Sequence, residues 1–239
     1  MEYIETNGRQ FVDTGVIGKT GTKCEFDFAW LANDTSTLIG VATNSAGHGF
    51  VPFAGQFGSG GVLKMFYSFG GSAFYWPQYW SDVETPAANG NQVFLHTGDR
   101  HHLTVELASG LQDIKVDGVC YYYDSGNIAL PNTGVRTVNA WSHNVEDGID
   151  TGRSMYLFAR RSMADVAESF SSVRLYKAKI WQKDGSGNYQ LVRDYRPVKL
   201  STGEIALWDK VNKNHLSACW SRSGAETRPY NSGFVLTFK

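Results

Sequence analysis

The chain has 239 residues, of which 42% are hydrophobic, 14% aromatic and 19% charged, a composition that supplies a sizeable core and excludes intrinsic disorder. With 22 basic and 23 acidic residues the net charge is −1, so we expect no nucleic-acid partner. No window approaches the roughly 18 consecutive apolar residues of a membrane span, and the segment Met1–Glu5 lacks the features of a secretion signal. We therefore expect no membrane insertion, and we expect that any export signal lies outside this sequence.

The predicted elements are short strands separated by Gly, Asn, Asp and Ser. The clearest strand covers residues 23–30, where Cys24, Phe26, Phe28 and Trp30 alternate with polar residues. Strands at 101–107 and 111–116 form a predicted hairpin through Ser109-Gly110, and Asp117-Gly118 turns the chain into a strand at 119–123.

Further strands are expected at residues 36–41, 62–69, 134–141, 155–160, 172–182, 189–197 and 205–209. Residues 183–188 read as a hairpin loop, and only Met163–Ser169 has the composition of a helical turn. The sequence has no internal repeat and no linker. We predict one domain over residues 1–239, an antiparallel β-sandwich of jelly-roll type.

The three cysteines, Cys24, Cys120 and Cys219, lie about a hundred residues apart. This spacing is typical neither of zinc nor of a redox site. Three small buried hydrophobes are the plainer interpretation, and one long-range disulfide with one free thiol is the alternative.

Both ends of the chain carry a resemblance. The opening Tyr3–Gly15, with its Asp13-Thr14-Gly15, resembles the first strand of bacterial and phage domains with the concanavalin A-like lectin/glucanase (laminin-G-like) fold. The segments Met155–Arg160, Val173–Trp181, Leu191–Pro197 and Gly203–Asn212 are similar to later strands of that group. The resemblance implies the fold and leaves the activity open, because lectins, adhesins, glycosidases and lyases share it.

Hydrolases of this fold carry several alternating carboxylates on one strand, two of which flank the scissile bond. Glu25-Phe26-Asp27-Phe28-Ala29 is the one similar run, and it stops one carboxylate short at Ala29. A solvated strand face is the stronger interpretation of Glu25 and Asp27. His101 and His102 are adjacent on a strand, so we expect them on opposite faces and sharing no metal.

The acidic loop at residues 144–150 offers oxygen ligands for calcium, with Asp147 and Asp150 as the candidates. A solvated hairpin tip is the alternative. No other cofactor is indicated.

The aromatic run at residues 66–80 holds eight aromatic side chains in fifteen residues. Gly70-Gly71 and Pro77 indicate loops there, so some rings should be exposed and able to stack on sugar rings. The candidate glycan-binding residues are Tyr75, Trp76, Gln78, Tyr79, Trp80 and Asp82. The alternative is that these aromatic residues fill the end of the sandwich. A second, weaker candidate is Tyr121-Tyr122-Tyr123.

We therefore predict a non-catalytic carbohydrate-recognition or adhesion module of an exported, cell-surface or phage protein, with a glycan and other domains of a larger chain as partners. A divergent glycoside hydrolase or lyase and a purely structural protein-interaction domain are the alternatives.

Overall fold

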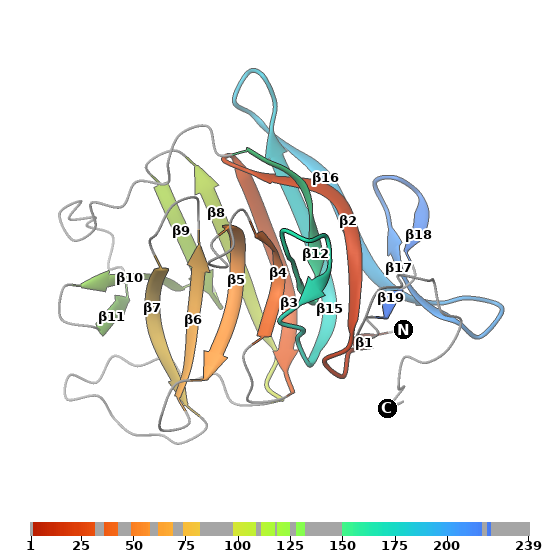
Figure 1. Cartoon of the computed structure of the whole chain (residues 1–239), viewed down its shortest axis with the longest axis horizontal. Coiled ribbons are helices and arrows are strands. Elements are labelled where there is room, and N and C mark those ends of the chain that lie inside the picture. Colours follow the sequence, from red (N-terminus) through yellow and green to blue (C-terminus); the bar gives the residue numbers. More distant parts are fainter. Residues whose placement is uncertain are drawn as a thin grey trace.

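The computed structural model describes residues 2–31, 36–42, 49–57, 62–68, 74–81, 98–108, 111–117, 119–124, 128–131, 150–216 and 219–220. These residues form strands, turns and bends and no helix, so the predicted all-β fold is confirmed. Two antiparallel sheets make a sandwich (Figure 1).

Among the described residues, the first sheet has ten strands, in the order β11-β10-β9-β8-β3-β15-β16-β17-β18, with β1 paired to β15. Their bounds are β1 Ile4–Glu5, β3 Thr22–Trp30, β8 His101–Ala108, β9 Leu111–Val116, β10 Val119–Asp124, β11 Ile128–Pro131, β15 Val173–Lys183, β16 Tyr189–Lys199, β17 Ile205–Asp209 and β18 Asn214–Leu216.

The described part of the second sheet has nine strands, in the order β19-β2-β12-β4-β5-β6-β7, with β13 paired to β4 and β14 paired to β13. Their bounds are β2 Gln10–Lys19, β4 Ser36–Ala42, β5 Gly49–Phe57, β6 Val62–Ser68, β7 Phe74–Ser81, β12 Asp150–Leu157, β13 Arg160–Arg161, β14 Ala167–Glu168 and β19 Cys219–Trp220.

The core lies between the sheets and follows from the alternation of apolar residues. On β3, Cys24, Phe26, Phe28 and Trp30 are buried, as predicted, and the polar residues between them lie on the outer face. Val12, Leu157 and Ile39 of the second sheet belong to the same buried cluster. The hairpin of β8 and β9 is also confirmed, because Ala108 pairs with Leu111.

The predicted helical turn at Met163–Ser169 is wrong. The chain forms a short hairpin there, in which β13 pairs with β14. Asp165 and Ser169 have φ values of +62° and +51°, which a right-handed helix does not allow. β13 also pairs in parallel with β4, so these residues are fixed by contacts distant in the sequence and not by helix propensity.

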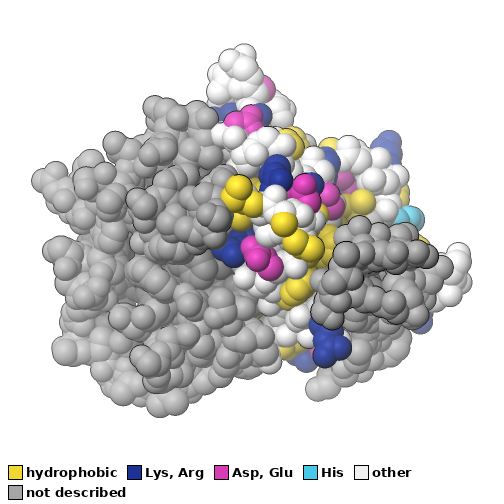
Figure 2. All heavy atoms as spheres, in the orientation of Figure 1, with side chains coloured by type: hydrophobic (Ala, Val, Ile, Leu, Met, Phe, Trp, Pro, Cys, Tyr) yellow, Lys and Arg dark blue, Asp and Glu magenta, His cyan; other side chains and the backbone are white. Residues whose placement is uncertain are grey.

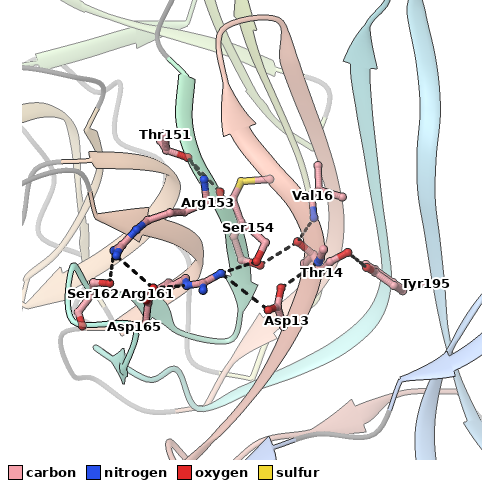
Figure 3. Close-up of polar contacts among 12 residues, drawn as sticks. Asp13, Thr14, Val16, Thr151, Arg153, Ser154, Arg161, Ser162, Asp165 and Tyr195 are labelled. Carbon is pink, nitrogen blue, oxygen red and sulfur yellow. Dashed lines mark hydrogen bonds and ion pairs between the residues drawn. The ribbon is translucent and has the colours of Figure 1, made fainter.

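Two of the segments that carry the resemblance meet in space (Figure 3). The Asp13 carboxylate accepts a hydrogen bond from Gly15 N at 2.9 Å, and Gly15 has φ +64°, so the Asp13 side chain closes a local turn. The Thr14 carbonyl accepts hydrogen bonds from Arg193 Nε at 2.8 Å and from Tyr195 Oη at 3.3 Å. These bonds join β2 of the second sheet to β16 of the first.

Candidate functional site

The aromatic run lies mainly on β6 and β7, and β7 is the last strand of the second sheet among the described residues. The candidates Tyr75, Trp76, Gln78, Tyr79 and Trp80 all fall within β7, and Asp82 lies outside the described residues. The interpretation of Pro77 as a loop residue is wrong, because β7 runs through it.

A bulge explains how a strand accommodates Pro77. Tyr75 pairs with Tyr67 and Gln78 pairs with Met65, so β7 has one more residue than β6 across this interval. Trp76 and Pro77 therefore occupy the bulge. Proline lacks the N–H that a ladder requires, and in sheets it is confined to edges and bulges.

The fold brings together the two aromatic segments that the sequence singles out. β7 of the second sheet contacts both β10 and β11 of the first sheet, which lie beside it in Figure 1. β10 contains Tyr121, Tyr122 and Tyr123, paired with residues of β11. Five aromatic residues of β7 and three of β10 thus come from opposite sheets to one end of the sandwich. Sequence spacing alone does not reveal this meeting.

The two carboxylates of the hydrolase-like run lie on the outer face of the first sheet, each beside a cation. Glu25 Oε1 accepts a hydrogen bond from Lys177 Nζ. Asp27 Oδ1 lies 2.5 Å from His102 Nδ1, and Asp27 Oδ2 lies 3.5 Å from Arg100 Nη2. Both carboxylates are therefore committed to partners within the sheet.

The charges around Asp27 set its protonation. Partial burial favours the neutral acid, but the hydrogen bond and charge of His102, with the charges of Lys177 and Arg100, outweigh burial and lower the pKa of Asp27. A general acid for glycoside hydrolysis needs the opposite shift. The environment of Asp27 is therefore that of an ion pair.

The two adjacent histidines have separate partners. His101 Nδ1 lies 2.8 Å from Asp117 Oδ2, and His102 Nδ1 bonds Asp27. His101 has a side-chain exposure of 12% and His102 of 42%, as expected for neighbours on opposite faces of a strand. The ring atom His101 Nε2 is buried and has no hydrogen-bond partner among the residues that the structure describes.

Of the two calcium candidates, Asp150 is exposed at the start of β12 and Asp147 lies outside the described residues. Asp150 Oδ1 accepts a hydrogen bond from Gly152 N at 2.8 Å, which closes a local turn. In the described part of the chain, no three His, Cys, Asp or Glu side chains group as metal ligands.

Cys24 is a free thiol buried in the core, and burial raises its pKa. The interpretation as a buried hydrophobe therefore holds for Cys24, and a disulfide through Cys24 is excluded. Cys120 lies on β10 and Cys219 on β19.

A polar cluster on the second sheet was not anticipated from the sequence (Figure 3). Arg153 and Arg161 both contact Asp165 Oδ1, at 3.2 and 2.9 Å. Arg153 also donates to the carbonyls of Ser162 and Met163, and Arg161 donates to Ser154 Oγ at 2.6 Å. These bonds hold the 162–166 loop onto β12. The spacing of Arg153 and Arg161 does not predict this cluster, because the two side chains reach the same carboxylate only through the fold of the chain around Asp165.

The face drawn in Figure 2 mixes basic, acidic and hydrophobic side chains in its described region. Met163 and Val166 of the loop are 48% and 46% exposed. Each arginine of the cluster already has Asp165 as its carboxylate partner. We therefore assign the cluster a structural role, which is to fix the 162–166 loop against β12.

Comparison with known proteins finds no family model and no curated protein that matches this chain. No helix in the described ranges is long and apolar enough to cross a membrane.

Proposed function

We propose that the protein is a non-catalytic carbohydrate-recognition or adhesion module of an exported, cell-surface or phage protein. The binding surface is the end of the sandwich where β7 meets β10. The meeting of two aromatic-rich strands from opposite sheets is the observation that supports this proposal. Sugar rings present C–H faces to aromatic planes, and Gln78 supplies an amide for hydroxyl groups.

The surroundings of Glu25 and Asp27 favour binding over hydrolysis. Retaining and inverting glycosidases need one carboxyl group that stays protonated near neutral pH. The pKa of Asp27 is lowered, and Glu25 is held by Lys177. This observation favours a sugar-binding module over a polysaccharide-degrading enzyme that uses this pair.

Glycan-array binding of Trp76→Ala and Trp80→Ala tests the proposal. We expect each variant to lose about fivefold or more in affinity for the glycans that the wild-type protein binds, taking the about 1–3 kcal/mol that an aromatic side chain contributes to stacking on a nucleobase as the scale. Trp208→Ala is the matched control, since Trp208 lies on β17 of the first sheet beside His215.

Trp76→Phe and Trp80→Phe guard against misfolding, because each keeps an aromatic ring. We expect them to retain most of the binding, with a melting temperature close to that of the wild type. Unchanged binding in both alanine variants would remove β7 from the proposal.

A further inference from the structure

A second surface lies on the outer face of the first sheet, at the hairpin end of β15 and β16. Lys179, Trp181 and Lys183 alternate along β15 and therefore share this face. Lys23 of β3 pairs with Trp181, and Tyr189 of β16 pairs with Lys183. We call Lys23, Lys179, Trp181, Lys183 and Tyr189 the lysine–aromatic ladder.

The lysines of the ladder lie over its rings. Lys23 Nζ is 5.5 Å from the Trp181 ring centroid and 6.0 Å from that of Tyr189. Lys179 Nζ is 5.6 Å from the Trp181 centroid, and Lys183 Nζ is 5.2 Å from the Tyr189 centroid. Cation–π attraction at these distances restrains the flexible lysine side chains, so the three charges are held above the sheet.

The ladder differs from its surroundings in charge pairing. Elsewhere on this sheet Lys177 pairs with Glu25, Arg174 with Glu5 and Arg196 with Asp194. Lys23, Lys179 and Lys183 form no ion pair with any described carboxylate. Three positive charges on neighbouring strands repel one another, and an anionic ligand would relieve that repulsion.

Polar and apolar groups surround the three charges. Burial, followed by the charge of Glu106 and a hydrogen bond with its carboxylate, raises the pKa of Tyr189. Glu106 pairs with Lys23 across β8 and β3. Leu191, which pairs with Trp181, is 37% exposed. A ligand on this face thus has a carboxylate acceptor in Glu106 and a small apolar surface in Leu191 nearby.

We propose that the lysine–aromatic ladder binds an acidic polysaccharide, a linear glycan that carries carboxylate or sulfate groups. The ammonium groups bind the acidic groups, and the Glu106 carboxylate accepts hydrogen bonds from hydroxyl groups of the glycan. A nucleic acid fits less well, because its bases need open ring faces for stacking and the lysines lie over those faces. This surface is separate from β7 and β10, so it does not depend on the function proposed above.

Isothermal titration calorimetry at low salt with polygalacturonate tests the proposal. Methyl-esterified polygalacturonate serves as the uncharged counterpart. A second comparison tests sulfate groups, with dextran sulfate as the acidic polymer and dextran as its uncharged counterpart. We expect binding to at least one acidic polymer, none to its neutral counterpart, and loss of affinity as salt screens the charges. The arm that binds identifies carboxylate or sulfate as the preferred group.

The double variant Lys179→Gln/Lys183→Gln should weaken this binding at least tenfold. The matched control is Lys210→Gln/Lys213→Gln, which removes the same charge from exposed turn residues outside the ladder. We expect the control to stay within twofold of the wild type, and Lys179→Arg/Lys183→Arg to retain binding.

Three results would overturn the proposal. They are no binding to either acidic polymer, equal weakening in the two glutamine double variants, and equally tight binding of single-stranded DNA or phosphatidylserine vesicles.

Discussion

Gly15, an exposed residue of β2, shows why one position of this strand has to be glycine. Its φ is +64°, and a Cβ there would lie 3.1 Å from Arg193 Nη2, the guanidinium that also bonds the Thr14 carbonyl. We expect Gly15→Ala to reduce the free energy of unfolding by about 1–2 kcal/mol, because L-residues are strained in this conformation. Urea denaturation measures the change.

Gly185→Ala is the control for that variant. Gly185 is an exposed hairpin residue without a positive φ, and a Cβ there would meet nothing within 4 Å. We expect a change within about 0.5 kcal/mol. Equal destabilisation by the two substitutions would show that the conformation of Gly15 is not the cause.

Asp27 links stability to pH. Its folded-state pKa is lowered by His102, Lys177 and Arg100 against the effect of burial, so it stabilises the fold above the unfolded pKa of about 3.9. That contribution is lost as the pH falls through the lower folded value. Melting temperatures between pH 2 and 6 should therefore fall less steeply on acidification in Asp27→Asn than in the wild type. Parallel curves would refute the ion-pair description.

At the scale of the elements, the Asp165 side chain holds the hairpin of β13 and β14 in place. Asp165 contacts Arg153 and Arg161 and has φ +62°. We expect Asp165→Ala to speed hydrogen exchange several-fold in residues 162–166, because it removes both ion pairs and strains the backbone. Global stability should fall by only about 1–2 kcal/mol.

Asp165→Asn separates the two causes. Asparagine tolerates the left-handed conformation but carries no charge, so its exchange rates should lie between those of the wild type and the alanine variant. Wild-type exchange in Asp165→Ala would mean that Asp165 does not hold the loop.

The same elements show how far the sequence predicts the fold. The alternation in β3 and the pairing of β8 with β9 follow from local signals, and both are confirmed. Met163–Ser169 is not a helical turn because β13 and β14 form a hairpin there and Arg153 and Arg161 bind Asp165 within it. The sequence pattern places Pro77 in a loop, but it lies in β7. The bulge that accommodates it arises from the pairing of β7 with β6, which the local sequence does not reveal. The contact between β7 and β10 depends on how the two sheets stack, which no local sequence pattern specifies.

At the scale of the whole molecule, Cys24 reports on global unfolding. Its side chain is fully buried between the sheets and burial raises its pKa, so little reactive thiolate forms. We expect iodoacetamide to modify Cys24 only at the rate at which the fold opens, and rapidly in concentrated urea. Peptide mass spectrometry distinguishes Cys24 from Cys120 and Cys219. Rapid alkylation in the native protein would contradict the described core.

The strand order of the first sheet has a consequence for how the protein is made. β3 pairs on one side with β8 and on the other with β15, where Thr22 faces Gln182. A ribosome must therefore add about 150 residues before β3 gains its second neighbour, and until then the nascent chain carries an unpaired strand edge open to aggregation. Chaperone demand during translation should consequently persist until β15 emerges from the exit tunnel.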